Sequence, residues 1–117
     1  MGSQPDNEAL RYQIGDLFLD TGTRRVSRGD DVLAVSGLTF DLLLTMANGA
    51  PSLVSYDELA RSVWGGRPVT PETITQRVKL LRDALADDAG APRYVELVRG
   101  QGYRLMPKVE AVSGPRE

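Results

Sequence analysis

Apolar residues recur with helical spacing near the middle of this chain. Thr70 is a suitable helix N-cap, and Pro71 occupies the first helical position, where no backbone N–H is needed. The apolar positions that follow are spaced i, i+4, i+7 and i+11, which places them along one side of a helix: Ile74, Val78, Leu81 and Leu85. The pattern therefore predicts an amphipathic helix over about 70–85, with its other side exposed.

Shorter patterns predict the elements that precede this helix. Short apolar runs alternate with turn residues between Tyr12 and Val35, which indicates a small antiparallel meander. A helix is expected from Gly37 to Asn48, with Ser36 as its N-cap. A second helix is expected from Ser55 to about Trp64.

The segment over about 94–106 has the pattern of a β-hairpin. Two runs rich in Tyr, Val and Leu flank Gly100-Gln101-Gly102, and glycines supply the positive φ that tight turns require. Arg99 and Arg104 lie near the ends of the turn. A helix followed by an arginine-tipped hairpin is typical of a winged helix-turn-helix, in which the helix enters the major groove of DNA. We therefore predict an α+β fold with an N-terminal antiparallel β-sheet, three helices and a C-terminal β-hairpin wing.

Short motifs recur in a fixed order along most of the chain. They include Leu38-Thr39-Phe40-Asp41, Val63-Trp64-Gly65, Leu81-Arg82 and Val98-Arg99-Gly100-Gln101-Gly102-Tyr103-Arg104-Leu105. In these motifs the chain, from about Tyr12 to Met106, resembles the OmpR/PhoB-type winged-helix DNA-binding domain of bacterial transcription regulators.

A finer likeness lies around the start of the long helix. Val69-Thr70 and Ile74-Thr75-Gln76 are more similar to the ToxR/CadC-type branch of that family, in which the domain is joined to a transmembrane segment. The resemblance thus implies a cytoplasmic location, either in a free regulator or in the cytoplasmic part of a membrane-anchored one.

The net charge of −2 argues against a polyanionic partner such as DNA, but the distribution of charge along the chain favours one. Residues 1–60 contain four Lys/Arg against nine Asp/Glu, whereas residues 61–108 contain nine against five. The predicted long helix and hairpin therefore lie in a basic half with a charge of +4, and the acidic half would face away from DNA.

The composition also limits the chemistry that this chain can perform. A length of 117 residues, 41% of them apolar, supports one small domain. The sequence contains neither His nor Cys, so disulfides and zinc–thiolate sites are excluded, and no cofactor or metal is expected. No serine lies in a nucleophile-elbow context, and we predict that the protein is not an enzyme.

Five residues of the long helix are candidates for contacts in the major groove. Gln76 can pair with adenine or form a less selective bond, and Lys79 can donate to guanine or to phosphate. Leu80 is unusual as a large apolar residue at an exposed helical position; it would pack either on a thymine methyl group or against the wing. Thr73 and Thr75 would bond phosphates or base edges near the helix N-terminus.

Four arginines complete the candidate site. Arg77 and Arg82 are interpreted as clamps on the DNA backbone, and Arg82 matches the family's Leu-Arg pair. The resemblance makes Arg99 the best candidate for a minor-groove contact. Arg67 lies in a turn that would touch phosphate or, as the family implies, RNA polymerase.

The expected organisation has three parts. Residues 1–10 are interpreted as a tag remnant with a disordered lead, 11–108 as the winged-helix domain, and 109–117 as a linker stub. The expected function is sequence-specific binding of double-stranded promoter DNA. By resemblance, two protomers would bind direct-repeat half-sites as a homodimer on DNA, next to RNA polymerase.

An alternative from another class stays open. The acidic Asp41, Asp57 and Glu58, together with the low net charge, also fit a protein-interaction module. Such a module would keep the winged-helix fold and contact RNA polymerase or a sensor domain, without useful DNA binding.

Overall fold

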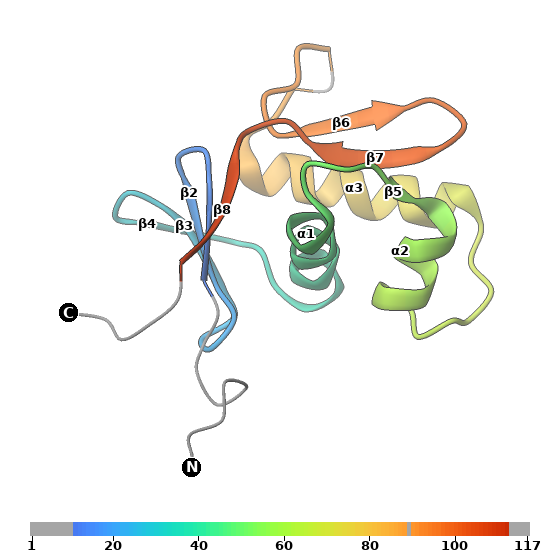
Figure 1. Ribbon diagram of the computed structural model, residues 1–117, viewed down its shortest axis with the longest axis horizontal. Coiled ribbons are helices and arrows are strands. Elements are labelled where there is room, and N and C mark those ends of the chain that lie inside the picture. Colours follow the sequence, from blue (N-terminus) through green and yellow to red (C-terminus); the bar gives the residue numbers. More distant parts are fainter. Residues whose placement is uncertain (1–10, 89, 113–117) are drawn as a thin grey trace.

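The computed structural model describes residues 11–88 and 90–112, which form two β-sheets around three helices (Figure 1). The elements are, in chain order, β1 (Arg11–Ile14), β2 (Leu17–Asp20), β3 (Arg25–Arg28), β4 (Asp31–Leu33), α1 (Gly37–Gly49), β5 (Val54–Ser55), α2 (Tyr56–Val63), α3 (Pro71–Leu85), β6 (Val95–Val98), β7 (Gly102–Leu105) and β8 (Val109–Val112). This α+β architecture confirms the predicted fold class.

The N-terminal meander forms an antiparallel sheet with the strand order β4-β3-β2-β1-β8. Residues that pair across its strands share a face, and one face is buried. Ile14 pairs with Leu17, and Leu19 pairs with Val26; all four are inaccessible to solvent. The buried face contributes to the single core shared with the helices.

The expected linker stub from residue 109 is wrong over Val109–Val112, which form β8. This strand pairs antiparallel with β1 and covers an edge that would otherwise expose unpaired backbone groups. Sequence patterning carries little signal for it because Glu110, Ala111 and Val112 are all exposed, so no apolar alternation marks the strand. The expected tag remnant at residues 1–10 and the rest of the stub at 113–117 lie outside the described residues.

The three predicted helices are present. Ser55 Oγ accepts a hydrogen bond from the backbone N–H of Glu58 at 3.1 Å and caps α2. Thr70 Oγ1 accepts from the N–H of Thr73 at 3.2 Å and caps α3, as the sequence predicts. Ser36 is the N-cap residue of α1 as expected, but its side chain makes no capping hydrogen bond.

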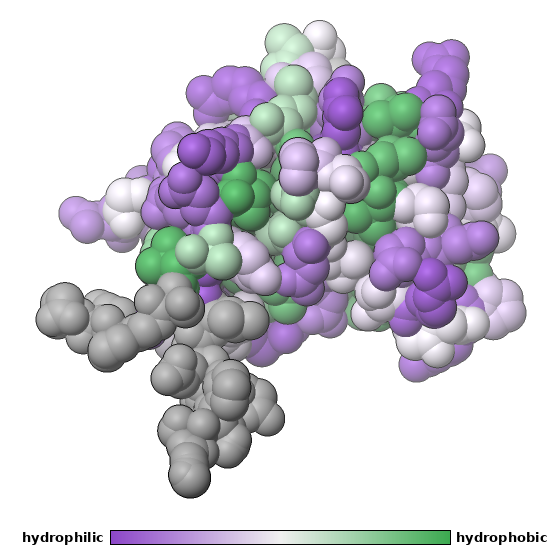
Figure 2. Space-filling model, in the orientation of Figure 1, coloured by the Kyte–Doolittle hydropathy of each residue, from purple (hydrophilic) through white to green (hydrophobic). Residues whose placement is uncertain are grey.

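The apolar side of α3 is buried as predicted. Ile74 and Val78 are 1% exposed, and Leu81 and Leu85 are completely buried. They belong to a core that also contains Phe40, Leu43 and Met46 of α1. On the face shown in Figure 2, hydrophilic residues cover most of the surface, and hydrophobic ones form smaller patches between them.

The C-terminal hairpin consists of β6 and β7, and β7 also pairs with the short β5. Gly102 is opposite Ser55 in this pairing. A Cβ atom at Gly102 would lie 2.1 Å from the carbonyl oxygen of Val54, so the two backbones approach too closely for any side chain. The wing is thereby tied to the start of α2.

We predict that Gly102→Ala lowers the free energy of unfolding by about 3 kcal/mol, because β5 must move to admit the methyl group. Gly100→Asn is the matched control. Gly100 lies in the turn, where a Cβ atom would meet nothing within 4 Å, and asparagine tolerates positive φ. Urea unfolding measures both; equal stabilities of the two variants would contradict the packing argument.

Candidate nucleic-acid interface

Helix α3 lies beside the hairpin (Figure 1). Two direct side-chain contacts join them. Thr75 Oγ1 lies 3.2 Å from the hydroxyl of Tyr103 on β7. Further along the helix, an Arg82 Nη donates to the carbonyl oxygen of Val95 on β6 at 2.8 Å. Helix and wing therefore form one connected surface.

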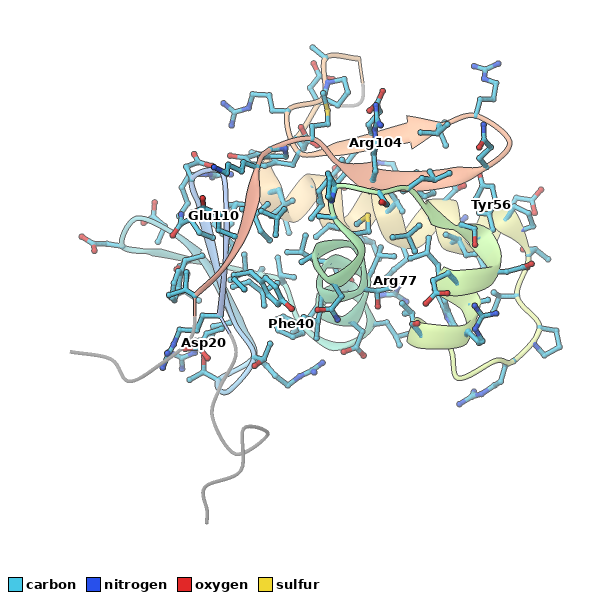
Figure 3. All side chains as sticks on the ribbon, viewed as in Figure 1. Asp20, Phe40, Tyr56, Arg77, Arg104 and Glu110 are labelled. Carbon is cyan, nitrogen blue, oxygen red and sulfur yellow. The ribbon has the colours of Figure 1, made fainter. Side chains whose placement is uncertain are left out.

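Several of the predicted contact residues already have partners within the protein. Thr73 lies 3.1 Å from the hydroxyl of Thr70, and an Arg77 Nη donates to Thr39 Oγ1 at 3.4 Å. Lys79 Nζ lies 3.7 Å from a carboxylate oxygen of Asp83, and both side chains are largely exposed. Of these residues, Arg77 is the one directed toward α1, as Figure 3 also shows.

Gln76 and Leu80 differ from these residues. Both are exposed on α3, one helical turn apart, and in the described part of the chain neither has a hydrogen-bond or ion-pair partner. Leu80 is 50% exposed and belongs neither to the core nor to the residues packed against it. Its position does not support the alternative of burial against the wing.

Arg82 and Asp87 hold the end of α3 against the start of β6. Asp87 has no side-chain exposure, and its carboxylate accepts from three backbone N–H groups. These belong to Arg93, at 2.6 Å, Tyr94, at 3.3 Å, and Val95, at 3.0 Å. Arg82 Nε lies 4.0 Å from the same carboxylate. The contacts give Arg82 a structural role beside its predicted phosphate contact.

Tyr94 links the hairpin to the N-terminal sheet. Its hydroxyl donates to Asp16 at 2.6 Å, and the guanidinium groups of Arg28 and Arg93 stack on its ring. Arg28 also donates to the carbonyl oxygen of Leu85 at 2.6 Å, at the last residue of α3. The Tyr94 hydrogen bond, reinforced by the arginines, lowers the pKa of Asp16 below its ordinary value despite partial desolvation.

A pair of tyrosines joins α2 to the wing. Tyr56 meets Tyr103 edge to face, with 6.0 Å between ring centroids. Burial, with a smaller contribution from Tyr103, raises the pKa of the Tyr56 hydroxyl above its ordinary value. Tyr103 thus connects α2 to Thr75 on α3.

The remaining arginines lie at the surface. Arg99, in the β6–β7 turn, and Arg67, in the segment before α3, are exposed and have no ion-pair partner among residues 11–88 and 90–112. Arg104 on β7 is bound to Glu96 on β6 at 2.7 Å. Arg99 is therefore the arginine available at the tip of the wing.

Sequence reasoning misses two structural residues of this interface. The sequence pattern assigns no structural role to Asp87 or to Thr39. The position of Asp87 just after the helix gives no sign of its backbone acceptor role, because that role depends on how the following strand returns. The Thr39–Arg77 bond joins residues on different helices and has no local signature.

Other kinds of site find no support in the part of the chain that the structure describes. No group of three or more His, Cys, Asp and Glu residues is placed to hold a metal ion there. In the same residues, no helix has the length and hydrophobicity needed to cross a membrane.

A three-helix unit with an arginine-tipped hairpin beside its third helix defines a winged helix-turn-helix domain. The family model described as "Transcriptional regulatory protein, C terminal" matches residues 30–105. The chain belongs to this family, which comprises OmpR/PhoB-type DNA-binding domains of transcription regulators.

Relatives of known name support this assignment. The DNA-binding response regulator MtrA of Mycolicibacterium smegmatis is 32% identical over 103 residues, which cover 87% of this chain and 45% of MtrA. The transcriptional activator CadC of Escherichia coli is 32% identical over 98 residues, covering 83% of this chain and 19% of CadC. The chain thus spans less than half the length of these relatives.

Solved structures agree on the fold. The DNA-binding domain of Klebsiella pneumoniae RstA, in complex with the RstA box, has a TM-score of 0.74 at 28% identity and covers 81% of this chain and 95% of that one. The DNA-binding domain of E. coli CadC has a TM-score of 0.74 at 29% identity, covering 93% and 98%.

We predict that Asp87→Asn lowers the free energy of unfolding by about 2–3 kcal/mol. Asparagine replaces one of the two carboxylate oxygens, which accept backbone N–H bonds, by an NH2 group that can only donate. Asp88→Asn is the matched control. Asp88 is exposed and accepts from the N–H of Gly90, a bond that asparagine can also accept, so a change within about 0.5 kcal/mol is expected. Urea unfolding measures the stability of both variants. Similar losses of stability in the two would contradict this role of the Asp87 carboxylate.

Proposed function

We propose that this domain binds double-stranded DNA sequence-specifically as the DNA-binding part of a bacterial transcription regulator. The observation that carries the proposal is the continuous surface formed by the exposed side of α3 and the Arg99-tipped hairpin, located in the basic half of the chain. An α-helix fits the major groove, while a flanking arginine suits the minor groove or the phosphate backbone. The RstA domain, which has the same fold, is known in complex with its DNA box.

The contacts within the protein suggest how DNA contacts are divided along α3. Gln76, Lys79 and Leu80 are exposed toward the groove and are assigned to base edges. Thr73 and Thr75, near the helix N-terminus, are assigned to the phosphate backbone.

The arginines divide in a similar way. Arg99 is assigned to the minor groove or its phosphates, and Arg67 to phosphate or RNA polymerase. Arg77 and Arg82 bond Thr39 and Val95 within the protein, and from those positions they would contribute positive potential next to the DNA backbone.

The proposal extends to the assembly and its location. A cytoplasmic regulator that binds direct-repeat half-sites as a dimer and contacts RNA polymerase fits the family to which the chain belongs. The alternative of a pure interaction module is weakened by the structure, because two of its three acidic residues are paired. Asp41 lies 2.9 Å from Arg24, and Glu58 lies 2.6 Å from Arg61.

Selection from a random duplex library tests the proposal. We expect one motif to be enriched, and Gln76→Ala to weaken binding to it by about 1–3 kcal/mol and to relax the preference at one position. Arg25→Ala is the control, since Arg25 is exposed on β3 in the other sheet. A library without an enriched motif, bound equally by wild type and Gln76→Ala, would favour the interaction module instead.

The salt dependence of binding tests the wing. Each phosphate contact contributes a slope of about 0.9 to the fall of log K with log salt concentration. We expect Arg99→Ala to reduce the slope by about one contact and to weaken all sequences similarly. Fluorescence anisotropy at several salt concentrations measures this. An unchanged slope would mean that the wing tip does not touch the backbone.

A further inference from the structure

Leu80 is the one large apolar side chain of α3 that lies outside the core, at 50% exposure. It occupies the middle of the exposed side of the helix, not an end. Its neighbours on that side are polar: Gln76 is one turn earlier, and Lys79 and Asp83 form an ion pair beside it. A single exposed leucine is common on protein surfaces, but at the centre of the side of α3 proposed to enter the major groove its side chain would be buried by bound DNA.

The polar residues of α3 are largely committed to the protein itself. Thr75 bonds the hydroxyl of Tyr103, Arg77 bonds Thr39, and Arg82 bonds the carbonyl oxygen of Val95. The ion pair with Asp83 also offsets the positive charge of Lys79 and its attraction for guanine or phosphate. Among the described residues on this side of the helix, Glu72, Gln76 and Leu80 have no hydrogen-bond or ion-pair partner. Because the Glu72 carboxylate is repelled by the phosphate backbone, Gln76 and Leu80 are the two side chains best suited to read bases.

The chemistry of these two side chains selects the same kind of base pair. The major groove offers one apolar group, the C5 methyl of thymine, and cytosine lacks it. A glutamine amide matches the N6 and N7 atoms of adenine. Residues four apart on a helix are separated by about 6 Å along its axis, against about 3.4 Å per base step, so the two contacts fall about two base pairs apart.

We propose that Leu80 is a specificity-determining residue that reads the methyl group of a thymine, and that Gln76 reads an adenine about two base pairs away. The inference rests on the proposed DNA binding and makes it more specific. The half-site of this domain contains A·T pairs at both positions. Recognition at the Leu80 position depends on burial of a methyl group and not on a hydrogen bond.

Replacement of single thymines by deoxyuridine in the selected half-site tests this directly, because it removes the methyl and keeps the base-pairing groups. We expect one such replacement to weaken wild-type binding about fourfold, the burial of one methyl-sized group expressed as a dissociation constant. In Leu80→Ala the same replacement should have no further effect. Val32→Ala, which truncates an exposed apolar residue on β4, should keep the full fourfold loss.

The experiment distinguishes a failure of the proposed Leu80 contact from a failure of sequence-specific DNA binding itself. An enriched motif without thymine, or a deoxyuridine effect that persists in Leu80→Ala, overturns the role of Leu80 and leaves sequence-specific binding intact. If no motif is enriched, the proposed function fails and the Leu80 inference fails with it. Circular dichroism checks that Leu80→Ala remains folded, as its exposed position leads us to expect.

Discussion

The burial of one side of α3 is the interaction on which the rest of this structure depends. Ile74, Val78, Leu81 and Leu85 are all but inaccessible to solvent, and each contributes about 1.5–3 kcal/mol by leaving water. Because a helix has fixed angular spacing, burial of this side also determines which residues face outward. The exposed row that includes Gln76 and Leu80 is therefore a consequence of how the helix packs against the core.

Burial orients α3 about its own axis, but a second set of contacts positions the wing beside it. Asp87 gathers three backbone N–H groups at the start of β6, and Arg82 reaches from the helix to the carbonyl oxygen of Val95. Tyr94 extends the connection to Asp16 in the N-terminal sheet. Gly102, on β7, lets that strand approach β5 closely. The wing is thus fixed to the end of α3 through β6 and to β5 through β7, and the Thr75–Tyr103 contact joins β7 to α3, so that helix and wing can act as one surface.

The sequence predicted the elements that have a periodic pattern or a strong turn signal, such as α3, α2 and the hairpin around Gly100. It failed for β8, whose exposed side chains carry no apolar alternation. It placed Ser36 correctly at the N-cap of α1, but residue type alone did not indicate that the side chain makes no capping bond. At the site it indicated which residues lie on α3, since helical spacing determines that. It separated Gln76 and Leu80, as groove residues, from Arg77 and Arg82, as backbone clamps. It did not indicate that these two arginines are bonded within the protein, because the partners Thr39 and Val95 come from other elements of the fold.

The difference between the bonded arginines, Arg77 and Arg82, and the unbonded Gln76 and Leu80 affects both the affinity and the specificity of DNA binding. A side chain bonded within the protein must break that bond, or share its donors, to reach a base, whereas an unbonded one gives up only its contacts with water. Arginines held in place still add positive potential near DNA, which strengthens binding to any sequence. Under the proposed function, base recognition would then depend on two side chains, the polar Gln76 and the apolar Leu80. On the same proposal, the domain would derive its affinity from charge that is indifferent to sequence, and its specificity from Gln76 and Leu80, whose side chains have no hydrogen-bond or ion-pair partner among the described residues.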